Sequence, residues 1–214
     1  MKRRLLAAFT LLVATTVPAA AHGQTGQRYS VQGSGLYAAL FGKAFEEINN
    51  GAGIELQFRV TPGQLSVGGG LQYTVHTPTE GAGEFFETIR LTGLFVEPRY
   101  VVDVGSARYA PYLSARLAIS AMSFVIAEGA TQPDVELNIE EPTGPTINGG
   151  GGVLIKLSNR VNLDLGATFG YTQFKDITIR AENTTTGQQA TAVVKVGSGS
   201  NMVLRAGLAI GLGG

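Results

Sequence analysis

The side chains best suited to acid–base chemistry in this 214-residue chain are its two histidines, His22 and His76. His76 with Ser34 or Glu87 has the residue types of an acyl-transfer site, in which a base activates a hydroxyl nucleophile. The pattern places no such nucleophile beside His76, and His22 lies near the N-terminus. We therefore expect no catalytic residues. Because the chain contains no cysteine, a thiol nucleophile and a thiolate zinc site are also excluded.

Two glycine-rich segments resemble nucleotide-binding motifs in part. Gly33-Ser34-Gly35 begins like a dinucleotide fingerprint, with Glu55 about twenty residues further on. The β-α-β continuation of that motif is missing, because hairpin-like segments follow. The glycines at 149–152 lack the Lys-Ser/Thr pair of a phosphate-binding loop. We expect no cofactor and no metal site.

Charged side chains recur on one face of a series of alternating segments. In segment 54–61, apolar residues alternate with Glu55, Gln57 and Arg59, which is the period-two pattern of a β-strand. The opposite face of these segments is nearly free of charge. The charged residues that we assign to the polar face are Arg59, Glu97, Arg99, Arg116, Lys156, Asp164 and Arg205.

Eight segments carry this alternation, and each is predicted to form a strand. They are 29–41, 54–61, 65–76, 88–103, 108–122, 148–158, 161–175 and 200–212. Short turns at 62–64, 104–107 and 158–160 alternate with long links at 42–53, 77–87, 123–147 and 176–199. We interpret the last link as a hairpin that extends beyond the strands. Ile89 and Leu91 have the opposite phase to the residues after them, which predicts a bulge near Thr92-Gly93.

Alternating short turns and long loops are typical of outer-membrane barrels, with the short turns on the periplasmic side. We predict an all-β fold: an eight-stranded antiparallel up-and-down transmembrane β-barrel, with its apolar face towards lipid and its charged face in the lumen. Eight strands leave a lumen that side chains fill, and buried charges must be paired. The charged residues should therefore plug the lumen. The turns predict Arg59 opposite Ser66, Glu97 opposite Ser114, and Lys156 opposite Asn162.

The N-terminal segment is predicted to direct export. Residues 1–21 combine Lys2-Arg3-Arg4, an apolar stretch and small residues up to Ala21, which is the pattern of a cleaved signal peptide. We assign residues 22–214 to one barrel domain. Without the signal peptide, 13 basic residues face 16 acidic ones, which excludes a nucleic-acid binder that relies on charge.

The order of several short motifs resembles a known family. These motifs are Gly-Ile-Glu-Leu-Gln-Phe-Arg (53–59), Phe-Val-Glu-Pro-Arg-Tyr (95–100), Ala-Pro-Tyr-Leu-Ser-Ala-Arg (110–116) and Lys-Leu-Ser-Asn-Arg-Val-Asn-Leu-Asp-Leu (156–165). The chain is similar to the OmpA/OmpX-like outer-membrane β-barrel domains. The resemblance implies an eight-stranded barrel in the bacterial outer membrane whose activity lies in its external loops. The chain departs from the family by ending in Leu212-Gly213-Gly214 rather than in an aromatic residue.

We expect a non-catalytic structural or surface-interaction role. The expected partners are outer-membrane lipid, with lipopolysaccharide as a candidate, and a surface partner reached through the external loops; we expect a monomer and no nucleic acid. One alternative is a soluble periplasmic β-barrel that binds a small apolar ligand. A second alternative is a lipid A-modifying barrel enzyme that uses His76. A third is a small pore.

The link 123–147 suggests a further hypothesis. It is acidic and contains no basic residue; its acidic residues are Glu128, Asp134, Glu136, Glu140 and Glu141. Such a loop would bind divalent cations that bridge lipopolysaccharide, whereas the alternative interpretation is a solvated acidic loop.

Overall fold

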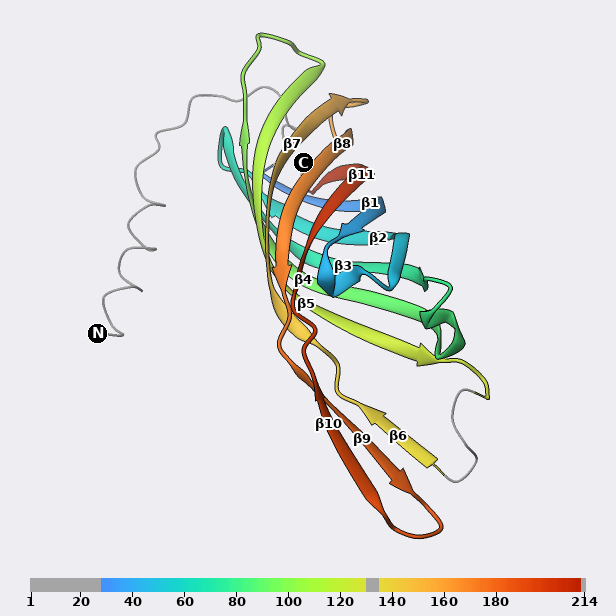
Figure 1. Ribbon diagram of the computed structural model, residues 1–214. Helices are drawn as coiled ribbons and strands as arrows, with labels where there is room; N and C mark the ends of the chain where they lie inside the picture. The colour runs from blue at the N-terminus through green and yellow to red at the C-terminus, as the bar shows by residue number, and fades with distance from the viewer. Residues whose placement is uncertain (1–27, 130–134, 213–214) are drawn as a thin grey trace, which may run out of the picture.

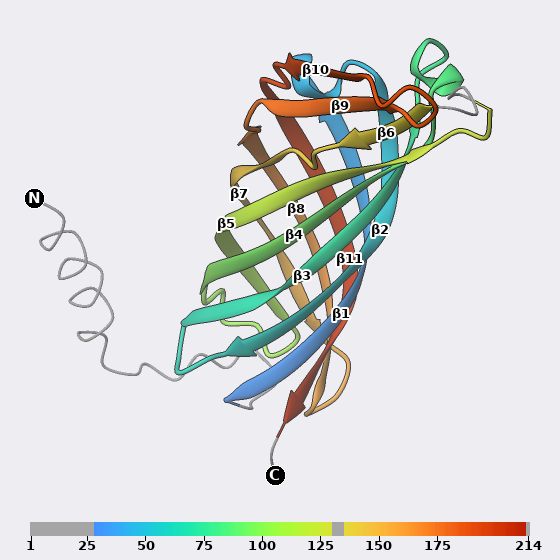
Figure 2. The ribbon, with the colours of Figure 1, turned by 90° about the horizontal axis from the view of Figure 1, so that it is seen from below.

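The computed structural model describes residues 28–129 and 135–212, and eight long antiparallel strands close into one barrel (Figures 1 and 2). The barrel strands are β1 (Tyr29–Phe41), β2 (Ile48–Val60), β3 (Leu65–Pro78), β4 (Phe86–Val101), β5 (Tyr109–Ile126), β7 (Thr143–Lys156), β8 (Val161–Gln173) and β11 (Ser198–Leu212). Each pairs with its neighbour along the chain, and β1 pairs with β11 to complete the closure. The predicted eight-stranded barrel is confirmed. The predicted signal peptide lies outside the described residues.

A second, three-stranded sheet extends from the long-loop end of the barrel (Figure 1). It consists of β6 (Val135–Ile139), β9 (Ile177–Asn183) and β10 (Gln189–Val194), in the order β10-β9-β6. The β9–β10 hairpin confirms the predicted extension. Strand β6 was not predicted, and it lies in the link that we expected to be a loop. We refer to these three strands as the extension.

The strand pairing differs from two of the three predicted registers. In the β2–β3 hairpin, Arg59 pairs with Gly68 and not with Ser66. Lys156 pairs with Asn162, as the turn predicted. In the β4–β5 hairpin, however, Ser114 pairs with Arg99 and not with Glu97, so the ladder is shifted by two residues. The connection is held by local hydrogen bonds, including one from the Gly105 amide to Asp103 Oδ1 (2.9 Å), and this turn geometry sets the register.

The predicted bulge near Thr92-Gly93 is wrong. Strand β4 pairs with β5 without interruption from Thr88 to Val96. Ile89 and Leu91 are buried on the lumen side, in phase with Glu97. These two residues are apolar because the lumen near the long loops is filled by apolar side chains. The lumen face of β4 therefore changes from apolar to charged along the strand without a bulge in the backbone.

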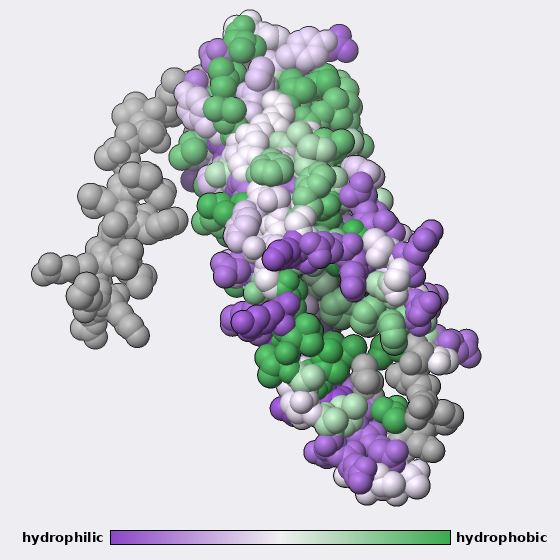
Figure 3. All heavy atoms as spheres, in the orientation of Figure 1, coloured by the Kyte–Doolittle hydropathy of each residue, from purple (hydrophilic) through white to green (hydrophobic). Residues whose placement is uncertain are grey.

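The outside of the barrel is a continuous apolar surface. Exposed apolar side chains point outward from every barrel strand, although glycines occupy the middle of this face on β1 and β7. Examples are Ile54, Leu94, Leu113 and Phe169, which are between 58% and 67% exposed. Figure 3 shows hydrophobic residues along the barrel, with hydrophilic residues gathered towards the extension. An exposed apolar band around a closed barrel is the surface that faces lipid in membrane barrels. None of the helices in the described ranges is long and apolar enough to cross a membrane.

This arrangement does not fit the soluble periplasmic barrel that we considered as an alternative. A soluble barrel buries its apolar face, because water contacts its outside. Here Glu97, Arg99 and Asp164 are buried inside, and the large apolar side chains lie outside. The barrel therefore has the orientation of a transmembrane barrel.

We predict that a charge on this outer surface destabilises the barrel. Leu94→Arg should lower the free energy of unfolding by about 2–4 kcal/mol, because the guanidinium replaces an apolar group in the hydrocarbon near the middle of β4. Urea unfolding in lipid vesicles measures the change. Val193→Arg, on the exposed strand β10 of the extension, should change it by no more than about 0.5 kcal/mol. Equal effects of the two substitutions would contradict the lipid-facing assignment.

Candidate functional site

The described interior of the barrel has three layers along its axis. A small apolar cluster of Val101, Ala110, Tyr112 and Leu154 lies near the short-turn end. A network of charged residues lies above it, and a larger apolar cluster closes the end near the long loops. The middle layer contains nearly all of the sequence-predicted charges.

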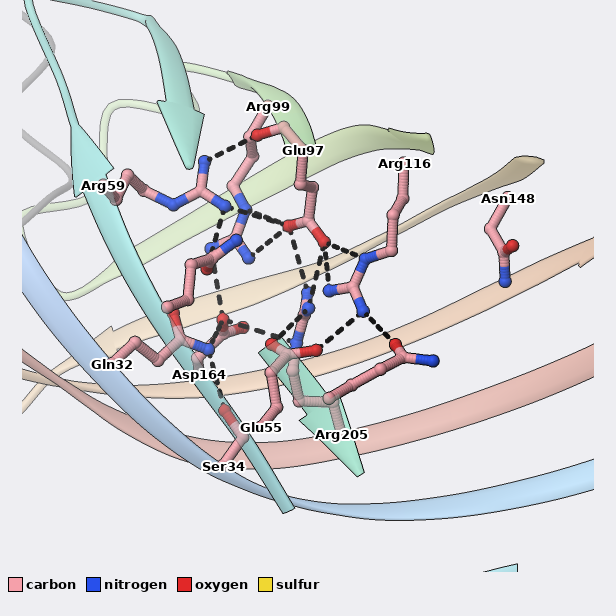
Figure 4. Close-up of polar contacts among 12 residues, drawn as sticks. Gln32, Ser34, Glu55, Arg59, Glu97, Arg99, Arg116, Asn148, Asp164 and Arg205 are labelled. Carbon is pink, nitrogen blue, oxygen red and sulfur yellow. Dashed lines mark hydrogen bonds and ion pairs between the residues drawn. The ribbon is translucent and has the colours of Figure 1, made fainter. Parts of the chain in front are cut away.

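Glu97 is the centre of the charge network (Figure 4). Its carboxylate accepts hydrogen bonds from Arg99 Nη2 (2.8 Å), Arg59 Nη2 (3.0 Å) and Arg205 Nη1 (3.1 Å), and it also pairs with Arg116. These four arginines come from three regions of the barrel wall, namely β2, β4–β5 and β11. The side chain of Glu97 is completely buried. One carboxylate on β4 therefore joins cations from around the lumen.

Two further carboxylates complete the network. Glu55 pairs with Arg116 Nη1 (2.6 Å) and Arg205 Nη1 (3.2 Å). Asp164 pairs with Arg99 Nη1 (3.1 Å). Four arginines thus face three carboxylates, so the fully ionised network carries one excess positive charge.

Two neutral side chains donate further hydrogen bonds to the Asp164 carboxylate. The Tyr112 hydroxyl donates to Asp164 Oδ1 (2.6 Å), and Gln32 Nε2 donates to Asp164 Oδ2 (2.7 Å). The Arg99 guanidinium lies over the Tyr112 ring, 3.9 Å from its centroid, so Tyr112 makes a cation–π contact through its ring and donates a hydrogen bond through its hydroxyl. Gly152 and Gly166 make room for this tyrosine, because a Cβ at either position would lie 2.5 Å from its hydroxyl oxygen.

The structure brings together six of the seven predicted lumen residues: Arg59, Glu97, Arg99, Arg116, Asp164 and Arg205. The prediction for Lys156 is wrong, because this half-buried residue lies at the end of β7 and its ammonium is not part of the network. Glu55 and Tyr112 were missed as members. Each alternates in step with the lumen-facing residues of its strand, Glu55 with Arg59 and Tyr112 with Arg116, and this alternation is the signal that could have identified them.

A ladder of neutral polar side chains lies on the external side of the charges. Ser120, Thr146 and Thr172 form a chain of hydroxyl hydrogen bonds of 2.8–2.9 Å, and Asn201 Nδ2 donates to Thr172 Oγ1 (3.3 Å). The adjoining cavity has a volume of about 40 Å³. This is room for only about one or two water molecules.

Apolar side chains close the external end of the lumen. The cluster consists of Ala44, Phe45, Ile48, Ile89, Leu91, Met122 and Phe174. Phe45 comes from a single 3₁₀ turn (Lys43–Phe45) that folds inward between β1 and β2, and its ring packs edge-on against Phe174 with centroids 5.8 Å apart. An ion that entered from this side would have to cross an apolar layer before reaching the charges.

The residues that resemble an acyl-transfer site do not come together. His76 Nε2 is hydrogen-bonded to Thr74 Oγ1 (2.8 Å), and His76 Nδ1 is hydrogen-bonded to the Asn49 carbonyl oxygen (2.9 Å). Ser34 pairs with Glu55 deeper in the barrel, whereas His76 pairs with Gly51. Glu87 is exposed. His76 is therefore a buried residue whose two ring nitrogens are both hydrogen-bonded within the barrel.

The acidic link shows no cation site in its described part. Glu136, Glu140 and Glu141 are exposed, and Glu140 Oε2 accepts a hydrogen bond from the Thr178 amide (3.1 Å). Within the described ranges, no three His, Asp or Glu side chains are grouped closely enough to hold a metal ion. Asp134 lies outside those ranges, so cation binding by the whole loop stays a hypothesis.

Comparison with solved structures identifies the fold. The chain is similar to Neisserial surface protein A (18% identity, TM-score 0.53, covering 86% of this chain and 97% of that one). It is also similar to a major outer membrane protein of Thermus thermophilus (15%, TM-score 0.54, 85% and 98%) and to the outer membrane protein OprG of Pseudomonas aeruginosa (9%, 0.51, 89% and 99%). By sequence, the chain matches no family model and no curated protein.

These similarities and the lipid-facing exterior agree on one class. The chain has the fold of a small eight-stranded outer-membrane β-barrel, as the sequence resemblance implied. The location expected from the sequence, the bacterial outer membrane, agrees with this fold and with the apolar outer surface.

We predict that the network depends on Glu97. Glu97→Gln keeps the shape of the side chain but removes the charge that four arginines share, so the free energy of unfolding should fall by about 3–5 kcal/mol. Urea unfolding in lipid vesicles, followed by far-UV circular dichroism, measures the change. Glu87→Gln on the same strand is the matched control, and its exposed side chain should matter by no more than about 0.5 kcal/mol.

Proposed function

We propose that this protein is a non-conducting, non-catalytic outer-membrane barrel with a structural or surface-interaction role. In this proposal, the barrel is a monomeric anchor in outer-membrane lipid, including lipopolysaccharide. The external loops and the extension provide the surface for contacts with other molecules. The proposal adds a role to the fold and the location that are described above.

The observation that carries the proposal is the buried charge network. Its eight ion-pair contacts link β2, β4, β5, β8 and β11 across the lumen. Removing one partner of a buried pair leaves an uncompensated charge, which costs several kcal/mol. A permeating ion would have to separate several such pairs at once. The network therefore supports a closed lumen rather than the small pore that we considered as an alternative.

The extension supports a role at the surface. All six residues of β10 are exposed, and Val193 is 70% exposed. Among the strands of residues 28–129 and 135–212, β10 pairs only with β9, so its other edge presents backbone amide and carbonyl groups that no described strand uses. Outer-membrane barrels have their longer loops on the extracellular side, so the proposal places the extension where other molecules can reach it.

Planar-bilayer recording tests the closed lumen. We expect no discrete conductance steps from the purified barrel, because both the charge network and the apolar layer block the lumen. Co-sedimentation of the same sample with liposomes controls for insertion. Discrete steps from inserted wild-type protein would overturn the non-conducting part of the proposal.

Mass spectrometry of lipid A tests the absence of catalysis. Cells that express the wild-type chain, the His76→Ala variant or an empty vector should have the same lipid A masses, because His76 is occupied by Thr74 and the Asn49 carbonyl. A mass change that appears with the wild type and disappears with His76→Ala would instead support the lipid A-modifying alternative.

A further inference from the structure

A second cavity lies outside the lumen, between the barrel mouth and the extension. Its volume is about 360 Å³, within the lower range of pockets that bind small molecules. Ile139, Ile177 and Ile179 line it from the extension, and Ile48, Ile89 and Met122 line it from the barrel. Figure 3 shows hydrophobic residues gathered where the extension leaves the barrel, bordered by hydrophilic ones.

The barrel side of this pocket is a preformed floor. Ile89 and Met122 are only 1% and 2% exposed, and both belong to the apolar cluster that closes the lumen. Phe124 packs against that cluster and also contacts Phe86, with ring centroids 5.0 Å apart. A ligand in the pocket would therefore contact side chains that are already fixed by packing, which lowers the entropic cost of binding.

The rim of the pocket is charged but has no net charge. Among the residues that line it, the four charged ones are Lys43, Lys195, Glu46 and Glu47. All four are exposed. Because the two positive charges are matched by two negative charges, the rim favours neither an anionic nor a cationic ligand over a neutral one.

The pocket also lies beyond the lipid-facing band. Arg90 is exposed on the outside of β4, external to Leu94. A charged residue on the lipid face is costly within the hydrocarbon, so Arg90 marks the edge of the band on this strand. Phe86, which lines the pocket, lies further out along β4.

We propose that this pocket binds the alkyl chain of a free, uncharged single-chain molecule from the external medium. The apolar walls provide the binding energy, and the rim, which has no net charge, offers a charged head group no net electrostatic attraction. The position beyond Arg90 favours a free molecule over a lipid acyl chain from the surrounding membrane. This site is separate from the charge network, so it does not rest on the lumen being closed.

Tryptophan fluorescence offers a direct test, because the natural chain contains no tryptophan. Phe124→Trp places a reporter in the pocket, and Phe169→Trp places one on the lipid-facing outside of β8. Each variant is reconstituted in phosphatidylcholine nanodiscs and titrated with 1-bromododecane, whose bromine quenches nearby indole. We expect saturable quenching for Phe124→Trp and quenching proportional to the amount of probe in the lipid for Phe169→Trp. The same unsaturated dependence for both reporters would overturn the proposal.

A second arm separates a free ligand from membrane lipid. Nanodiscs made with brominated phosphatidylcholine should quench Phe169→Trp and leave Phe124→Trp largely unquenched. Equal quenching of both reporters would mean that lipid chains fill the pocket, which also overturns the proposal.

A pair of neighbouring substitutions tests the location. Val194 lines the pocket, whereas Val193 does not, because successive residues of β10 face opposite sides. In the Phe124→Trp background, Val194→Asp should raise the probe concentration at half-saturation by about tenfold, because a carboxylate replaces an apolar contact. Val193→Asp should leave it unchanged. Both positions are exposed enough to tolerate the change, and circular dichroism checks that each variant folds. Identical titrations for the two variants would contradict the site.

Discussion

The need to neutralise four arginines inside a narrow barrel is the constraint on which the rest of the structure depends. Eight strands enclose a lumen that side chains must fill, and water is too scarce there to solvate charge. Glu97 pairs with all four guanidinium groups, and Glu55 and Asp164 each pair with two of them, which leaves one positive charge in excess. The apolar layers at both ends then isolate the network from bulk solvent. The closed lumen that we propose depends on this arrangement.

Much of this architecture was predictable from local alternation, because one strand residue in two must face the lumen. The strands, their number and six network members follow from that rule. The Glu97–Ser114 register did not, because the turn after β4 is set by side-chain hydrogen bonds such as that from Gly105 to Asp103. Lys156 had the correct phase, but phase does not report depth, and it lies too near the end of its strand to reach the charges.

The predicted bulge shows a different limit of the same rule. Alternation identifies the two faces of a strand only if each face keeps one polarity along its length. The lumen changes from charged to apolar along its axis, so Leu91 and Glu97 share a face although their polarities differ. Strand β6 was missed for a related reason, because a short strand that pairs only outside the barrel has too few residues to establish a period.

The contact between Tyr112 and two glycines has a consequence for how such barrels diverge. Gly152 and Gly166 lie on adjacent strands, and neither has room for a methyl group while the tyrosine hydroxyl is present. At Gly152, a methyl group would also lie 2.3 Å from the Leu165 carbonyl oxygen, so this position requires glycine whatever residue stands at 112. At Gly166, the tyrosine hydroxyl is the closest obstacle, so a larger residue becomes acceptable there once position 112 loses its hydroxyl, and that loss also removes a hydrogen-bond donor from Asp164. Related chains should accordingly vary at positions 112 and 166 together.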